Sequence, residues 1–379
     1  MMSDYRDADP NIVNIAREFA AEIIEPQALS WEQAGGLPRE FFRQAAKRGL
    51  CGLLVPKKLG GLGASNLTLA AVLAEMASSC FAATFGLIVH NNLGSSIAVN
   101  GSQKHLALLP EMIAGEKIGA FLLTEPGAGS DAGAIAMSAK ENARGAILNG
   151  EKAWITNGAL ADVLAVYVQT GSKQGANGIA SYLLDTNDFE CQRSERYDLA
   201  GARAMNVCGF NFQDVEVDQD CLMIEAGRAF KAAMGGIDTA RAMVSAMCCG
   251  ITRRALEEAV SYTKARKVFG GAVAELQVPQ HVLADVSTDL EAADALTERA
   301  VIALDNKSGA TIAAAHAKKF SAGMAMRRIA DCMQMMGAAG ALGDYPLARH
   351  LACAKLAQIV DGTSEIQNVV LSRALFSQA

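Results

Sequence analysis

The stretch Leu356-Ala357-Gln358-Ile359-Val360-Asp361-Gly362-Thr363-Ser364-Glu365-Ile366-Gln367, near the C-terminus, is the part of the sequence around which the rest is organised. The apolar run before it, 351–360, predicts a helix that Gly362 ends, and Thr363-Ser364 can cap a second helix. Asp361 then stands in a helix break, where its side chain and free backbone N–H groups can face one pocket. Such a carboxylate is suited to removing a proton alpha to a carbonyl that accepts hydrogen bonds. A solvated aspartate at an ordinary turn is the alternative.

Length and composition indicate a large globular protein. The 379 residues suggest two to three domains, and the hydrophobic fraction of 51% allows a sizeable core. The net charge of −6, with no basic block, gives no sign of nucleic-acid binding. Nine cysteines without a CxxC pair and five scattered histidines predict neither a disulfide framework nor a metal site. We expect a cytoplasmic protein, since the acidic N-terminal residues do not resemble a signal peptide and no apolar stretch is long enough to span a bilayer.

The apolar periodicity changes twice along the chain. Residues 11–115 read as helices, with the first run ending at Pro26. Short apolar or alternating runs then predict strands at 118–123, 163–168, 179–184 and 208–212, and Asn149-Gly150 predicts a hairpin turn. Long helical stripes return at 282–304 and 313–330. We therefore predict an α+β fold, mostly α, with an N-terminal helical domain (1–115), a middle β domain (116–222) and a C-terminal helical bundle (223–379).

Two segments could line a ligand site. His90-Asn91-Asn92 interrupts an apolar run, and its side chains are either satisfied core groups or the lining of an apolar pocket. The loop 124–131 is glycine-rich, but Pro126 and a GxGxxxG spacing without a following helix argue against a dinucleotide fingerprint. Its hydroxyls and bare N–H groups could still face a ligand, although a plain β-turn is equally compatible. Trp154 could stack on a ring or belong to the core.

Five segments together resemble the acyl-CoA dehydrogenase family: 123–131, 149–158, 266–270, 334–340 and 361–367. They follow the family's order and spacing across essentially the whole chain. The resemblance implies a helical domain, a β-barrel-like domain and a four-helix bundle. It also implies an FAD enzyme, usually a homotetramer, that converts an acyl-CoA to the enoyl-CoA and passes electrons to an electron-transfer flavoprotein.

The resemblance also implies the roles of particular residues. Asp361 would remove the alpha proton, and the beta hydrogen would pass to FAD as hydride. FAD contacts would come from Phe121, Leu123, Thr124, Gly129, Ser130, Trp154, Ile155, Thr156, Arg266, Phe269, Gln277, Gln334, Gly337, Ala338, Thr363 and Glu365. Those around Arg266 would act across a subunit interface. The acyl-CoA would be contacted by Ser130, Asp238, Arg241 and Gly362. The two arginines could instead be ordinary surface charges.

The sequence differs from the family's usual pattern at position 361, where the catalytic base is expected. The commonest base is Glu, and Asp361 is one methylene shorter; Ala240, at the other position that some members use, has no acidic group. We therefore keep Asp361 as the base and expect a branched or alicyclic acyl chain. One alternative is a flavin oxidase of a small carbon acid, since the nitroalkane oxidase branch also uses Asp. Another is a non-catalytic flavin-binding relative.

Overall fold

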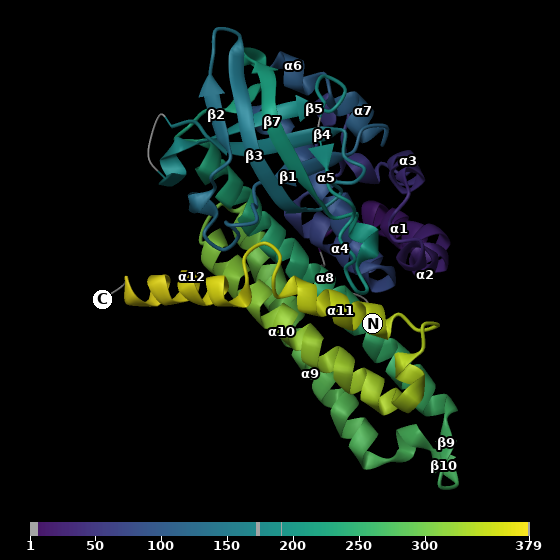
Figure 1. The fold of residues 1–379 in the computed structure, drawn as a ribbon. Helices are drawn as coiled ribbons and strands as arrows, with labels where there is room; N and C mark the ends of the chain where they lie inside the picture. Colours follow the sequence, from purple (N-terminus) through teal and green to yellow (C-terminus); the bar gives the residue numbers. More distant parts are fainter. Residues whose placement is uncertain (1–6, 172–174, 191, 378–379) are drawn as a thin grey trace.

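A computed structural model describes residues 7–171, 175–190 and 192–377, in which helices at both ends of the chain flank a β-sheet (Figure 1). The N-terminal helices are α1 (Pro10–Phe19), α2 (Glu25–Gln33), α3 (Arg39–Lys47), α4 (Asn66–Ser79), α5 (Phe81–Asn100), α6 (Gln103–Leu106) and α7 (Leu109–Ile113). The expectation that Pro26 ends a helix is wrong, because a π-helical segment (Ala20–Ile24) joins α1 directly to α2. Pro26 lies in the first turn of α2, directly after the π-helical segment, so the proline is accommodated where the helical pattern changes.

His90 and Asn91 on α5 are satisfied core residues. The Asn91 side chain accepts a hydrogen bond from the Leu53 N–H (2.8 Å) and donates one to the Leu50 carbonyl (2.9 Å). The His90 ring lies between the Met112 carbonyl and the Gly119 N–H, both at 3.1 Å, and burial lowers its pKa to about 4. A neutral ring that donates at one nitrogen and accepts at the other fits both partners. For His90 and Asn91, the first of the two readings of this segment is confirmed.

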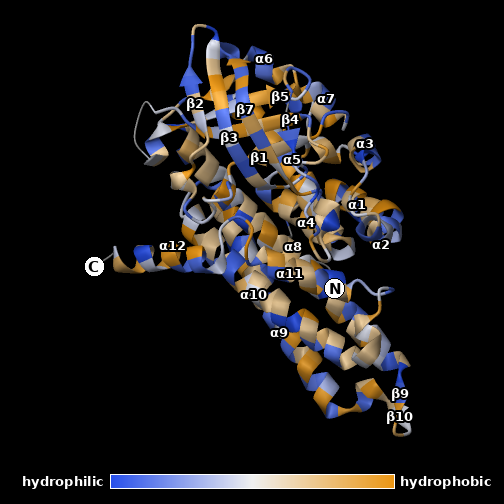
Figure 2. Cartoon of the chain, viewed as in Figure 1, coloured by the Kyte–Doolittle hydropathy of each residue, from blue (hydrophilic) through white to orange (hydrophobic). Residues whose placement is uncertain are grey.

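Eight strands form one sheet in the described middle of the chain. They are β1 (Gly119–Leu122), β2 (Ser138–Glu141), β3 (Gly145–Ile155), β4 (Val163–Gln169), β5 (Ile179–Asp185), β6 (Gln192–Arg193), β7 (Cys208–Asp218) and β8 (Leu222–Ile224). The order is β6-β7-β3-β2-β4-β5-β8, with β1 parallel to β4. One apolar cluster is made by the strands and their loops alone, and a second joins the sheet to α5 and α7. Figure 2 shows β4 and β5 as strongly hydrophobic, as expected for strands between two cores.

The predicted hairpin turn at Asn149-Gly150 is wrong. Both residues lie inside β3, which continues to Ile155 beside β7, and the pairing shifts register between Leu148 and Gly150. Gly150 has φ 139° and forms a β-bulge, so its conformational freedom bends the strand without reversing it. The chain reverses earlier, where the Asn142 side chain accepts hydrogen bonds from the N–H groups of Arg144 and Gly145.

The C-terminal bundle contains α8 (Ala229–Ala265), α9 (Gln277–Asp305), α10 (Ala310–Met336), α11 (Leu347–Ala357) and α12 (Ser364–Phe376). A short ribbon of β9 (Lys267–Val268) and β10 (Gly271–Ala272) lies at the end of the bundle remote from the sheet (Figure 1). Ser245 on α8 hydrogen-bonds Thr297 on α9 and Ser321 on α10, both at 2.6 Å. This buried hydroxyl network lies in the core of the bundle and links the three helices to one another. In the part of the chain that the structure describes, no helix has the length and hydropathy to cross a membrane.

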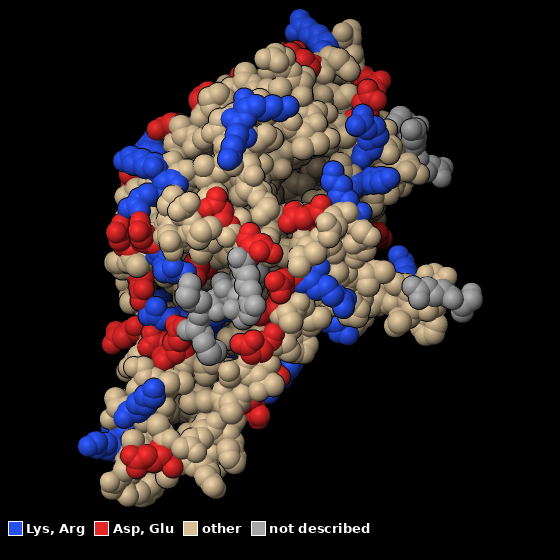
Figure 3. Space-filling view, turned by 180° about the vertical axis from the view of Figure 1, so that it is seen from behind, with Lys and Arg blue, Asp and Glu red and all other residues tan. Residues whose placement is uncertain are grey.

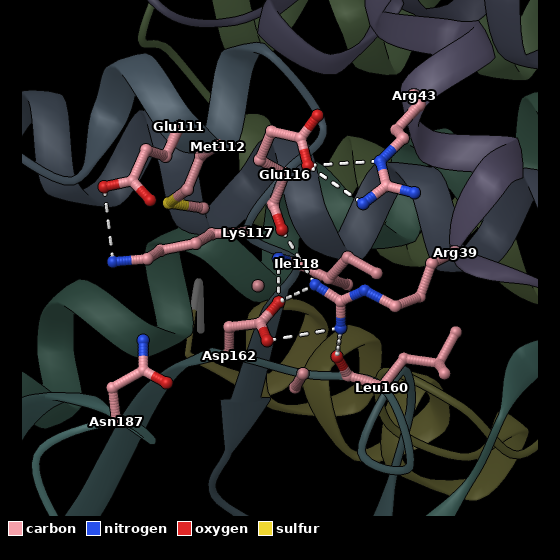
Figure 4. Close-up of polar contacts among 12 residues, drawn as sticks. Arg39, Arg43, Glu111, Met112, Glu116, Lys117, Ile118, Leu160, Asp162 and Asn187 are labelled. Carbon is pink, nitrogen blue, oxygen red and sulfur yellow. Dashed lines mark hydrogen bonds and ion pairs between the residues drawn. The ribbon is translucent and has the colours of Figure 1, made fainter.

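An ion-pair network joins α3 to the sheet (Figure 4). The Arg39 guanidinium contacts the Asp162 carboxylate at 2.6 and 3.2 Å and donates to the carbonyls of Leu160 (2.8 Å) and Glu116 (2.7 Å). Asp162 also accepts the Ile118 N–H (2.8 Å), immediately before β1. The first helices are thereby held against the start of β1 and β4, and the apolar contacts of α5 complete the junction.

Candidate active site

Asp361 lies in a left-handed turn between α11 and α12. Its φ is 53° and that of Gly362 is 90°, conformations that Asp tolerates better than most residues and that Gly adopts freely. Thr363 caps α12, its hydroxyl accepting the Ile366 N–H at 3.3 Å. The predicted break and the cap at Thr363 are therefore present, but α11 ends at Ala357, before Gly362, and residues 358–361 form a turn. In Figure 1 the loop that carries Asp361 rises from the bundle toward the strands.

Three side chains hold the carbonyl groups of this turn. Arg241 on α8 donates from Nε to the Asp361 carbonyl (3.0 Å) and also pairs with Asp238 (2.8 Å). Gln367 donates to the Gly362 carbonyl (2.8 Å), and Lys318 on α10 donates to the same oxygen from Nζ. A Cβ at position 362 would lie 3.1 Å from both Arg241 and Gln367, so the clamp leaves little room there.

In this turn, Asp361 offers both a carboxylate base and a backbone N–H donor. Among the residues that the structure describes, the Asp361 N–H has no backbone or side-chain acceptor. Burial raises the pKa of the Asp361 carboxyl, while the positive charges of Lys318 and Arg241 oppose the rise. Because a raised pKa makes the carboxylate a stronger proton acceptor, this arrangement can abstract a proton beside a carbonyl held by the N–H.

The loop after β1 offers an open surface. Glu125 and Ala128 exchange backbone hydrogen bonds at 3.0 and 3.2 Å, which closes a tight turn. A Cβ added at Gly127 or Gly129 would meet nothing within 4 Å, so the loop is open on that side. The Thr124 carbonyl accepts the Ala153 N–H (3.0 Å) and so ties this loop to the strand end that carries Trp154.

Trp154 presents its indole to the outside. It has φ 62°, its side chain is 60% exposed, and its ring meets Tyr197 edge-on with centroids 4.8 Å apart. An exposed Trp held in a left-handed conformation is a strained arrangement that calls for a functional reason. Thr156 follows two residues later, and Thr124 is joined to this strand end through the Ala153 N–H; both threonines are half-buried. The exposed indole beside them fits a flat heteroaromatic ring such as a flavin.

Comparison with known proteins identifies the family to which this chain belongs. The domain models of the acyl-CoA dehydrogenase N-terminal, middle and C-terminal domains match residues 7–116, 120–215 and 227–376. The solved butyryl-CoA dehydrogenase of Megasphaera elsdenii is 30% identical, covers 99% of both chains and superposes with a TM-score of 0.93. The chain belongs to the acyl-CoA dehydrogenase family. It is an FAD-dependent oxidoreductase that acts on CH–CH groups of CoA thioesters.

Two relatives show the range of activities around this acyl-CoA dehydrogenase. It is 34% identical to a 3-(aryl)acrylate reductase of Clostridium sporogenes over 96% of this chain and 97% of the relative. It is 30% identical to the caffeyl-CoA reductase-Etf complex subunit CarC of Acetobacterium woodii over 99% of this chain and all of the relative.

The remaining predicted contacts of this acyl-CoA dehydrogenase fall into two groups. Phe121 on β1 is half-buried against Tyr167, and Leu123 and Ile155 are buried, so the last two could offer a ligand their main chain alone. A second group lies where α8 ends, α9 begins and α10 ends, at the end of the bundle remote from the sheet (Figure 1): Arg266, Phe269, Gln277, Gln334, Gly337 and Ala338. One chain does not bring this second group beside Thr124 and Trp154.

Two buried lysines contact the candidate site although the sequence alone gave them no role. Lys152 on β3 donates to the Leu123 carbonyl (2.9 Å) and to Glu125 (2.8 Å), and Lys318 contacts the Asp361 turn. Both are 1% exposed. For Lys318 a signal existed, because it falls at four-residue spacing between Ala314 and Ala322, on the apolar stripe of a predicted helix.

Proposed function

We propose that this enzyme dehydrogenates an acyl-CoA to the enoyl-CoA, with Asp361 as the base that removes the alpha proton. The observation that carries the proposal is the turn itself. Its carbonyls are tied down by Arg241, Lys318 and Gln367, while burial raises the pKa of the carboxyl and the N–H of the same residue is free. The bound FAD supplies the hydride acceptor, so the chain has to orient the thioester and take one proton.

Other side chains are proposed to bind and orient. Trp154, Thr156 and the 124–130 loop would hold the flavin ring, and Thr363 and Glu365 would contact FAD beside the base. Ser130, Gly362 and the Asp238–Arg241 pair would contact the acyl-CoA. Arg241 suits this task because its guanidinium already links α8 to the Asp361 carbonyl, so a contact with the thioester would be transmitted to the base.

The shorter base is proposed to reflect the acyl group. Replacing Glu by Asp withdraws the carboxylate by about one C–C bond, and a displacement of ~1 Å can cost on the order of a hundredfold in rate. An acyl chain whose alpha carbon lies closer to the main chain would restore the contact. We infer a branched or ring-bearing acyl group, and the aryl substrate in the name of one relative is in keeping with a ring.

The proposal also covers the domain boundaries, the assembly of the chain and the acceptor of its electrons. The chain is proposed to divide at 115 and 222, to form a homotetramer and to pass electrons to an electron-transfer flavoprotein. Phe269 supports assembly because its side chain is 99% exposed at the remote end of the bundle, where a second copy could bring it to a flavin. The Etf complex of one relative supports the electron acceptor.

The test is anaerobic mixing of purified enzyme with straight, branched and ring-bearing acyl-CoAs while flavin bleaching is followed. Bleaching fastest with a branched or ring-bearing thioester supports the full proposal, and faster bleaching by straight chains removes its substrate part. Bleaching by nitroalkanes alone would identify the oxidase. No bleaching by any compound would identify a non-catalytic relative.

Asp361→Asn tests the base. Asn also tolerates a left-handed turn, so we expect the fold and FAD content to be kept while flavin reduction falls by about 10²- to 10⁴-fold. Asp344→Asn, at an exposed aspartate, is the matched control. Unchanged reduction in Asp361→Asn would remove this residue from the mechanism.

A further inference from the structure

Lys318 is a charged residue inside the helical bundle. It lies on the buried stripe of α10 with Ala314, Ala322 and Ala325, whereas the adjacent Lys319 is exposed. Burial of an ammonium group is unfavourable unless other groups compensate, and here burial lowers the pKa of Lys318 to about 8. A lysine at such a position requires a specific partner.

The partner is the turn that carries the base. Lys318 Nζ donates to the Gly362 carbonyl, and Arg241 Nε donates to the preceding carbonyl, that of Asp361. A peptide unit is planar, so fixing two successive carbonyls fixes two successive peptide planes. The left-handed conformation of Asp361 and Gly362 is thus held from α8 and α10 together, and with it the place from which the Asp361 side chain projects.

Lys318 also acts on the charge of Asp361. Its ammonium group is the largest of the favourable electrostatic influences on this carboxyl, followed by Arg241. The other charged or titratable groups facing the pair come from three helices: Asp238 and the Cys248 thiol on α8, Glu365 on α12 and, through Glu365, Lys355 on α11. Arg241 and Lys318 are both buried and both bonded to the turn, and Lys318 is the less exposed of the two, at 1% against 7%.

We propose that Lys318 is a positioning residue for proton abstraction, which holds the turn in its left-handed form and places a positive charge beside the Asp361 carboxyl. The proposal rests on the proposed function, since it assigns Lys318 a role through Asp361. It separates two tasks. Burial raises the pKa of the Asp361 carboxyl and makes its carboxylate a stronger base, and the adjacent ammonium group opposes that rise.

The experiment compares Lys318→Met with Lys319→Met in the FAD-loaded enzyme, using the rate of flavin reduction by an acyl-CoA across pH. The Asp361 carboxyl must be ionised to act, so the rate falls as pH drops through its pKa. Without the ammonium group that pKa rises, and we expect the acid limb of Lys318→Met to move up by on the order of one pH unit. We also expect at least a roughly tenfold lower rate at neutral pH, while Lys319→Met behaves as wild type.

A second readout does not depend on activity. Amide hydrogen exchange over residues 358–364 should be faster in Lys318→Met than in wild type or Lys319→Met, because the turn has lost one of its anchors. If Lys318→Met does not fold, Lys318→Gln carries the same test, since it removes the charge and keeps a donor; its acid limb should still shift. A wild-type pH profile and exchange in the folded variant would overturn the role of Lys318. An active Asp361→Asn enzyme would instead overturn the proposed function.

Discussion

Two buried lysines support the candidate site in the same way. Lys318 holds the turn of the base, and Lys152 holds the loop proposed to face the flavin. In both, burial lowers the pKa to about 8, because an ammonium group loses its hydration inside the protein. The compensation differs. Lys152 has a direct carboxylate partner in Glu125, which in turn accepts the N–H groups of Ala136 and Met137.

Lys152→Met should weaken FAD binding. The change frees the Leu123 carbonyl and leaves the Glu125 carboxylate without its cation, and breaking a buried pair costs roughly 3–5 kcal/mol. We expect the dissociation constant of FAD, from titration of the apoprotein followed by flavin fluorescence, to rise by about tenfold or more. Lys140→Met, at an exposed lysine of β2, is the control.

The double variant Glu125→Gln/Lys152→Met separates two effects of this substitution. It removes the unpaired charge, so thermal stability should recover relative to Lys152→Met while FAD binding stays weak. Wild-type FAD affinity in a folded Lys152→Met protein would show that Lys152 supports the fold and has no role in placing the loop.

At the scale of elements, two arginines join α3 to the start of the sheet, and their polar contacts differ in geometry and in exposure to solvent. Arg39 makes a two-pronged contact with Asp162 and bonds two carbonyls (Figure 4). Arg43, one turn further along α3, pairs with Glu116, and both of these side chains are about half exposed. Forked, charge-assisted bonds that also satisfy main-chain groups are stronger than a pair in water.

Arg39→Ala should therefore destabilise the protein more than Arg43→Ala. We expect about 1–3 kcal/mol for Arg39, because Asp162 and two carbonyls lose their donor. For Arg43 we expect at most about 1 kcal/mol, since that pair is exposed and screened. Thermal midpoints of the two variants, measured in the same buffer with FAD bound, test the difference. Equal midpoints would show that apolar packing alone holds the junction.

At the scale of the molecule, two groups of exposed apolar side chains lie on parts that project from the body. Phe269, Leu276 and Val278 are exposed at the end of the bundle remote from the sheet, and Leu375 and Phe376 at the end of α12, which projects sideways from the bundle (Figure 1). Charges of both signs are interspersed over the face in Figure 3, so no extended region of one sign stands out among its coloured residues. Apolar contacts are thus the better candidates for assembly.

Phe269→Ser should weaken the proposed assembly. The substitution removes an aromatic ring that is 99% exposed in one chain, so it should leave the monomer fold unaffected and shift the protein toward smaller species. Sedimentation velocity at several concentrations measures this shift, and FAD content should fall in parallel. Val99→Ser, at a valine that is 77% exposed on α5, is the control. Unchanged assembly and FAD content would place the interface elsewhere.

Much of the local structure could be predicted from the sequence alone. The order of helices, strands and helices, the break between two helices before Thr363 and the cap at Thr363 each depend on a periodicity or a cap carried within a few residues. The tight loop after β1 also followed from local residues. These features need no knowledge of distant parts of the chain, which is why the reading from sequence agrees with the structure.

Tertiary structure decided the features that need a distant partner. Asn149-Gly150 reads as a turn, but pairing with β7 along its whole length makes the same residues a bulge within β3. Lys318 falls on the apolar stripe of a predicted helix, but its partner, the Gly362 carbonyl of the Asp361 turn, comes only from the packing of α10 in the fold. A local pattern records what a segment can do by itself, whereas the neighbour that selects among those possibilities is determined by the fold.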